Sequence, residues 1–154
     1  MKGNTINAFN DLILINNDRL KEYQLVLEEA HKENQDLEIV FLNIISQIEK
    51  FNHQLRQLVE SNGSRAETES SVSGMLHRSW LNFKFSLKSH NRKYMLIACE
   101  HCEDVTKEAY KEVLYSDNDM TQEQREIISN QLVEQDMSHK MIKALRDKAL
   151  AEEV

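Results

Sequence analysis

Residues 35–61, QDLEIVFLNIISQIEKFNHQLRQLVES, carry the periodicity that decides the fold. The large apolar side chains of this stretch recur at intervals of three and four residues: Val40, Phe41, Ile44, Ile48, Phe51, Leu55, Leu58 and Val59. That spacing places them on one face of an α-helix. The stretch therefore predicts a long amphipathic helix whose apolar face is covered by other helices.

Three further stretches have the same period and predict long helices over residues 5–31, 92–115 and 122–149. Thr121 and Gln124 form the T-x-x-Q pattern of a capping box at the start of the last one. The link between the first two helices is so short that they must form an antiparallel hairpin. The residues expected to face inward are Phe9, Leu12, Ile13, Leu20, Tyr23, Leu27, Ala30, Tyr94, Met95, Ala98, Cys102, Val105, Ala109, Val113, Ile128, Leu132, Ile142, Leu145 and Ala149.

A long connection separates the two helical pairs. Its first part, SNGSRAETESS (61–71), is polar and reads as a loop, whereas residues 72–88 predict a shorter fifth helix. Leu81 and Phe85 fall on the face opposite the main apolar stripe of that helix, so they and Arg78 form a candidate subunit interface. Two hairpins joined by one long crossover are the ferritin-like arrangement, so we predict one all-α, ferritin-like antiparallel four-helix bundle over residues 1–154.

Composition and charge narrow the possible classes of protein. The chain has no proline, three glycines and a net charge of −7, which disfavours binding to nucleic acid or anionic lipid. No apolar run is long enough to insert into a membrane and no signal peptide is evident, so we expect a cytoplasmic protein with reduced thiols. Residues 71–99 contain no acidic residue and five basic ones, which are expected to pack on acidic helices of the chain or to contact a partner: Arg78, Lys84, Lys88, Arg92 and Lys93.

Four strings of residues support a resemblance that covers residues 9–148. INNDRLKEY (15–23), SVSGMLHRSW (71–80), CEHCEDVTKEAY (99–110) and HKMIKALRD (139–147) occur in the order found in a family of bacterial ferritin-like four-helix-bundle proteins catalogued as a domain of unknown function. The chain closely resembles that family. The resemblance implies a ferritin-like bundle from a bacterium and an association with stress responses, but it implies no particular chemistry.

A di-iron bundle needs an inward Glu on two helices and a Glu-x-x-His on each of the other two, and this set is incomplete here. The first helix has Asn16 at the centre of its inward stripe, with Glu22 to one side. In the second helix, Glu49 and His53 are four residues apart and are expected to be exposed. Glu100 is expected to point away from the core, and Glu103, Glu112 and Asp136 are expected at its edges or flank. We therefore expect no cofactor, with iron or zinc possible only at an altered site.

The predicted core holds polar residues in place of that ligand set. Gln131, Gln135 and His139 follow one another at intervals of four, and Asn16 and Tyr23 lie on the inward stripe of the first helix. One interpretation is a hydrogen-bonded network that fixes the register of the helices. The other is an altered pocket, binding one metal through His139 or a small polar ligand.

Cys99 and Cys102 form a C-x-x-C pattern in the middle of a predicted helix. A zinc site needs ligands from a second motif, which the sequence lacks, and a thioredoxin-type pair lies at a helix N-terminus after a strand. We expect Cys102 to be a core residue and Cys99 a boundary residue, with zinc or redox chemistry as the alternative.

The function favoured by these patterns is that of a non-enzymatic bundle with a degenerate di-metal site. It would act in a stress response through a homo-oligomer, with a dimer as the commonest case, or through contact with a protein partner. The alternative is a metal-binding protein or an oxidase with an altered site around His139. A thiol redox role is the third hypothesis.

Overall fold

The computed structural model describes residues 3–66, 91–116 and 119–152, and within these ranges the chain is helical with no strand. The helices are α1 (Gly3–Glu33), α2 (Gln35–Glu60), α4 (Arg92–Tyr115) and α5 (Gln122–Ala151). The predicted all-helical class is confirmed, and the bounds of these helices agree closely with the periodicity of the sequence. The predicted helix over residues 72–88, with Arg78, Leu81 and Phe85, lies outside the described residues.

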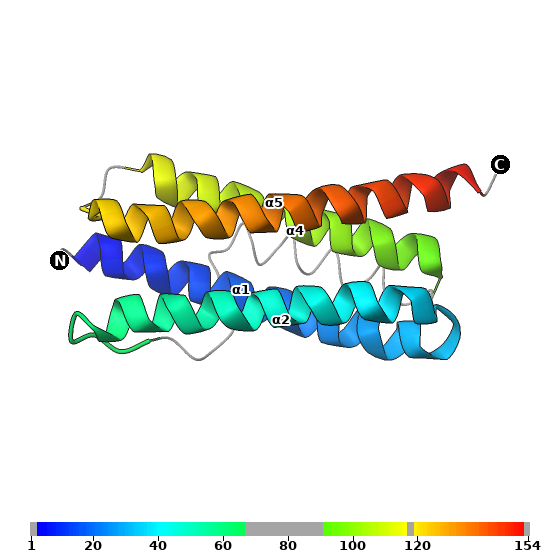
Figure 1. The fold of residues 1–154 in the computed structure, drawn as a ribbon, viewed down its shortest axis with the longest axis horizontal. Coiled ribbons are helices and arrows are strands. Elements are labelled where there is room, and N and C mark those ends of the chain that lie inside the picture. Colours follow the sequence, from blue (N-terminus) through cyan, green and yellow to red (C-terminus); the bar gives the residue numbers. More distant parts are fainter. Residues whose placement is uncertain (1–2, 67–90, 117–118, 153–154) are drawn as a thin grey trace.

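The four helices lie alongside one another and form an elongated bundle (Figure 1). α1 packs mainly on α2 and α4 packs mainly on α5, while α1 also contacts α4. The colours of Figure 1 show that α1 and α5 run in one direction and that α2 and α4 run in the other. Among the described helices, none combines the length and the continuous apolar character of a transmembrane span.

Local hydrogen bonds mark where α2 and α5 begin. Asn34 alone separates α1 from α2, and its carbonyl accepts a hydrogen bond from the Leu37 amide at 2.9 Å. At the start of α5 the predicted capping box is present: the Thr121 hydroxyl accepts from the Gln124 amide at 3.1 Å, and the Gln124 side chain accepts from the Thr121 amide at 2.9 Å. These contacts satisfy amide groups that a helix start leaves without partners.

The apolar core consists of two clusters at the two ends of the bundle. One contains Tyr23, Phe41, Met95, Cys102 and Ile142 with their neighbours. The other contains residues such as Phe9, Leu12, Leu55, Tyr110 and Ile128. Between them lie buried or partly buried polar side chains from all four helices, which we call the polar belt: Asn16, Arg19, Gln47, Asn52, Gln54, Glu103, Thr106, Gln131, Gln135 and Ser138.

The buried face of α4 is wider than the predicted one. Tyr94, which was expected to face inward, is 39% exposed, whereas Leu96 is fully buried. The buried residues of α4 include a series spaced by three and four, namely Leu96, Cys99, Glu103, Thr106, Tyr110 and Val113. The face is thus wider than the predicted stripe, because polar Glu103 and Thr106 form part of the interior together with the predicted Met95, Ala98, Cys102, Ala109 and Val113.

Candidate functional site

An ion pair lies at the centre of the polar belt. Arg19 on α1 donates from Nε to Glu103 Oε2 at 2.7 Å and from Nη2 to Glu103 Oε1 at 2.6 Å. Neither side chain is exposed to solvent. Because two parallel N–H···O bonds join the guanidinium to the carboxylate, the pair has the bidentate geometry that is strongest for these groups.

The surroundings keep Arg19 charged. Burial by itself lowers the pKa of a guanidinium, but the Glu103 carboxylate and its hydrogen bonds more than compensate, so the pKa of Arg19 is raised. The guanidinium carbon also lies 5.9 Å from the centre of the Tyr23 ring, within the range of a cation–π contact. The centre of the bundle therefore contains a cation that belongs to the protein itself.

Two glutamines connect this ion pair to the remaining helices. Gln47 on α2 accepts a hydrogen bond from Arg19 Nη2 at 2.9 Å, and it donates to Ser138 Oγ at 3.1 Å and to the Glu134 carbonyl at 3.2 Å. Gln135 on α5 donates to the backbone carbonyl of Glu103 at 2.8 Å. The pair thus has direct or one-step contacts to all four helices.

A second hydrogen-bond network crosses the bundle next to the apolar cluster that contains Phe9 and Leu55. The Asn16 amide donates to the Tyr110 hydroxyl at 2.9 Å, and that hydroxyl donates to Gln131 Oε1 at 2.6 Å. Gln131 Nε2 then donates to Gln54 Oε1 at 2.9 Å and to the Phe51 carbonyl at 3.2 Å. Residues from α1, α4, α5 and α2 are joined in that order. Burial raises the pKa of Tyr110, so its hydroxyl remains a proton donor at neutral pH.

The residues predicted to form one core polar pocket are distributed over separate sites. Asn16 and Gln131 belong to the Tyr110 network, and Gln135 contacts the backbone of Glu103. Tyr23 is fully buried beside Arg19 and Phe41. His139 lies farther along α5 and hydrogen-bonds to neither network in the described part of the chain.

His139 instead contacts Glu100, which was expected to point away from the core. His139 Nε2 lies 3.0 Å from Glu100 Oε1, and Arg146 Nη1 lies 3.0 Å from the other oxygen of Glu100. The side chains of His139 and Glu100 are 10% and 18% exposed. This trio brings one imidazole and one carboxylate together at the edge of the α4–α5 contact.

Both thiols are buried, which corrects the expectation for Cys99. Cys99 is 3% exposed and Cys102 is fully buried, and both are free cysteines. Burial and the nearby charge of Glu103 raise the pKa of each thiol well above its usual value. Because the thiolate is the reactive form, this environment makes both cysteines poor nucleophiles and poor metal ligands at neutral pH.

Inspection of the sequence missed Arg19, and it placed Glu22 and Glu103 outside the core centre. In the structure Glu22 is 4% exposed and Glu103 is fully buried. The signal was present as spacing, since residues 9, 12, 16, 19, 23, 26 and 30 of α1 recur by three and four and are all buried. A charged residue in such a series can be buried only beside a partner that neutralises it, and here that partner lies on another helix.

Among the described residues, no three His, Cys, Asp or Glu side chains are grouped so that they could hold a metal ion. Fold and site together define a helical-bundle protein whose buried Arg19 and Glu103 are paired with each other. The chain belongs to the family described as a domain of unknown function (DUF2383), whose model matches residues 4–116. The prediction that it belongs to a family of unknown function is thereby confirmed, and Arg19 and Glu103 lie within the matched residues. No curated protein and no solved structure matches the chain.

Proposed function

We propose that this protein is a bacterial ferritin-like bundle in which an ion pair of the protein replaces the di-metal centre. It forms a single non-enzymatic domain that acts through oligomerisation or contact with a protein partner, in the stress response that the family resemblance implies. The observation that carries the proposal is the bidentate pairing of Arg19 with Glu103 at the centre of the bundle.

The charge at this position explains why a metal is unfavourable there. Both oxygens of Glu103 accept hydrogen bonds from a guanidinium, and neither side chain is exposed. A metal ion that bound Glu103 would have to displace Arg19 and leave a buried cation without its counter-charge, which costs several kcal/mol. The guanidinium therefore places one buried positive charge beside the carboxylate, where a di-iron bundle has metal ions.

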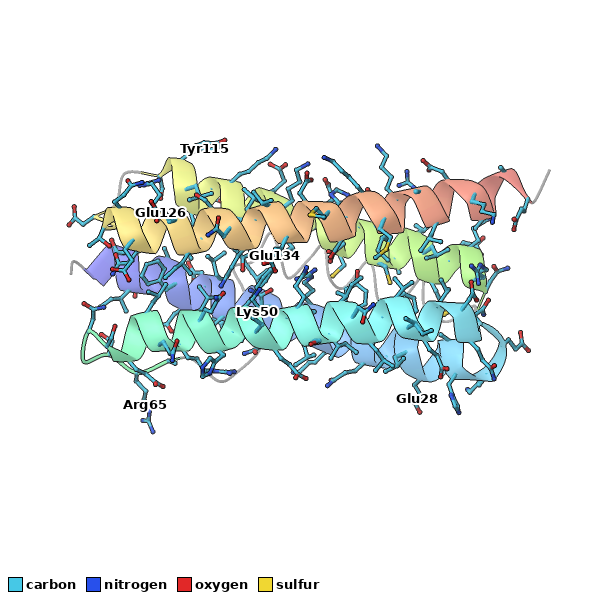
Figure 2. All side chains as sticks on the ribbon, viewed as in Figure 1. Glu28, Lys50, Arg65, Tyr115, Glu126 and Glu134 are labelled. Atoms are coloured by element: carbon cyan, nitrogen blue, oxygen red, sulfur yellow. The ribbon has the colours of Figure 1, made fainter. Side chains whose placement is uncertain are left out.

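Elemental mass spectrometry after aerobic loading with Fe²⁺ or Zn²⁺ tests the proposal. We expect less than about 0.1 metal ion per chain in the untagged protein, because the buried carboxylate is occupied by Arg19. Lys50→Met, which removes a cation from an exposed ion pair with Glu134, should leave this value unchanged. In Figure 2 Lys50 on α2 and Glu134 on α5 lie at the surface on facing helices. Two metal ions per chain in the unmodified protein would overturn the proposal.

A metal-binding protein or oxidase with an altered site is the second candidate function. The observation that favours it is the 3.0 Å contact between His139 and Glu100, which provides one nitrogen and one oxygen ligand. The same measurement distinguishes it from the first candidate. One metal ion per chain that is lost in His139→Ala, but retained in the control His53→Ala on an exposed position of α2, would favour this site.

Action through protein contact is supported by apolar side chains on the surface of α5. Val133 is 60% exposed, Met137 67% and Met141 42%. Single exposed apolar residues are ordinary in a monomer, but a contiguous row of them on one helix face is typical of an interaction surface.

A further inference from the structure

The outer face of α5 has a regular arrangement of apolar residues. Val133, Met137 and Met141 follow one another at intervals of four, so they lie close together along one side of the helix. Ala144 and Asn130 are exposed on the same side, one turn beyond the ends of this row. We call these five residues the α5 outer face.

An open groove runs beside this face, between α5 and α2. Its volume is about 330 Å³, and it is lined by Gln47, Glu134, Met137, Ser138 and Met141. Both methionines are flexible and polarisable, a property that suits a surface that adapts to a packing partner. The α5 outer face thus has both a ridge and a neighbouring recess.

Charge is distributed oppositely on the two sides of Met137. Glu123, Glu126, Glu134 and Asp136 precede it, whereas Lys140, Lys143, Arg146 and Lys148 follow it, with Arg125 and Asp147 as the main exceptions. Glu126 and Lys148 are each eleven residues from Met137, and both are exposed. Eleven residues complete about three turns of an α-helix, so Glu126, Met137 and Lys148 lie on the same side of α5.

We propose that the α5 outer face binds a second copy of this chain, with the two α5 helices antiparallel and a two-fold axis beside Met137. This arrangement places Met137 against Met137 of the partner subunit and Val133 against Met141 of the partner subunit. Glu126 then lies at the same height as Lys148 of the partner subunit, and the symmetry repeats that ion pair at the other end. The inference rests on the proposed function in one respect, that the protein acts through contact.

Self-complementarity of the α5 outer face favours a second copy of the chain as its occupant. A two-fold interface uses the same patch on both subunits, so every residue before the axis must suit one after it. The apolar row and the opposed charges of α5 meet this requirement about the same residue. Glu134 and Lys140, three residues on either side of Met137, do not contribute to this match because they pair with Lys50 and Asp136 of their own chain.

Sedimentation equilibrium of the untagged full chain over a range of concentrations tests the proposal, with Met137→Glu as the variant. The substitution brings two like charges together at the axis, so we expect the dimer to dissociate at least about tenfold more readily. Met137 is 67% exposed, so the monomer should retain its helicity by circular dichroism. Leu25→Glu is the matched control, because Leu25 is an exposed apolar residue, 44% exposed, on α1.

A charge exchange between Glu126 and Lys148 adds a second test, whose expected result cannot arise from a change in the stability of the monomer. Glu126→Lys or Lys148→Glu places like charges opposite one another at both ends and should weaken the dimer by about tenfold. The double variant with both substitutions should restore it. The two residues are about 33 Å apart along one helix at 1.5 Å per residue, so such a rescue can only occur between chains.

The outcomes separate this inference from the proposed function. Weakening by each single substitution and rescue by the double variant support the α5 interface. A dimer that none of these variants affects would overturn the α5 interface while leaving oligomerisation intact, and the predicted interface at Leu81 and Phe85 would then be tested by Phe85→Glu. A monomer at every concentration would overturn both the α5 interface and the proposed homo-oligomer.

Discussion

Arg19 and Glu103 are 84 residues apart in the sequence, yet they form a bidentate ion pair with N···O distances of 2.7 and 2.6 Å and no exposure to solvent. The desolvation of two charges opposes such a pair, and its Coulombic attraction offsets that cost only when the geometry is good and the remaining polar groups are bonded. Gln47 supplies one of those additional bonds, from α2. The ion pair therefore depends on the packing of three helices.

Removal of one member of the ion pair should destabilise the fold strongly. Arg19→Met leaves Glu103 buried without its counter-charge, so we expect the free energy of unfolding to fall by about 3–5 kcal/mol in urea titrations. The double variant Arg19→Met with Glu103→Leu removes both charges and should recover most of that loss. A loss in the double variant as large as the sum of two single losses would show that the pair does not act as a unit.

Loss of the Tyr110 hydroxyl should lower the free energy of unfolding less than loss of Arg19 does, because it removes neutral hydrogen bonds and leaves no buried charge unpaired. Tyr110→Phe removes the donor to Gln131 Oε1 and the acceptor for the Asn16 amide. Asn16 keeps its bond to the Leu12 carbonyl at 3.0 Å, so the cost should be about 1–3 kcal/mol in the same urea titration. Tyr115→Phe is the control, because Tyr115 is 82% exposed. An equal effect of both substitutions would contradict a role for the network.

Features of the fold and the site could be predicted from the sequence where they depend on residues close together in the chain. Helix bounds and the capping box at Thr121 follow from residues within a few positions of each other, and both were predicted. The inward position of Asn16 and Gln131 was also predictable, since each continues an apolar series of its own helix.

The buried position of Arg19 could not be predicted in the same way. Its burial is favourable only beside Glu103, and the contact between them depends on how α1 packs against α4. The same cause explains why the predicted face of α4 includes the exposed Tyr94 and leaves the buried Glu103 at its edge. Polar residues that continue an apolar series on two different helices are the sequence signal that could have identified the pair.

The two cysteines should react slowly in the native protein. Cys99 and Cys102 are buried with raised pKa values, so a thiol reagent at pH 8 should modify them mainly when the bundle opens. With a chromogenic disulfide, we expect the rate of thiol modification, followed by absorbance, to be at least about 100-fold lower in the native protein than in 8 M urea. Modification at the unfolded rate would instead support the thiol redox hypothesis.

Stability should decrease in alkaline solution. The thiols of Cys99 and Cys102 have pKa values raised by burial, and burial also raises the pKa of the Tyr23 hydroxyl. Above about pH 8.5 the unfolded chain loses thiol protons that the native chain retains, so ionisation favours unfolding. The urea midpoint should therefore fall between about pH 8 and pH 10, and the fall should be shallower in Cys99→Ala with Cys102→Ala. A midpoint that is constant or rises over this range would contradict the assignment.

The single residue between α1 and α2 has a consequence for how the chain folds. Because Asn34 alone joins these helices, their contacts close short loops and lose little chain entropy, whereas the pairing of Arg19 with Glu103 must await the closure of a loop of 84 residues. The α1–α2 hairpin can therefore form early and independently of the ion pair. In stopped-flow experiments we expect Arg19→Met to accelerate unfolding more than it slows folding. The buried ion pair would then lower the unfolding rate of the native bundle while leaving its folding rate nearly unchanged.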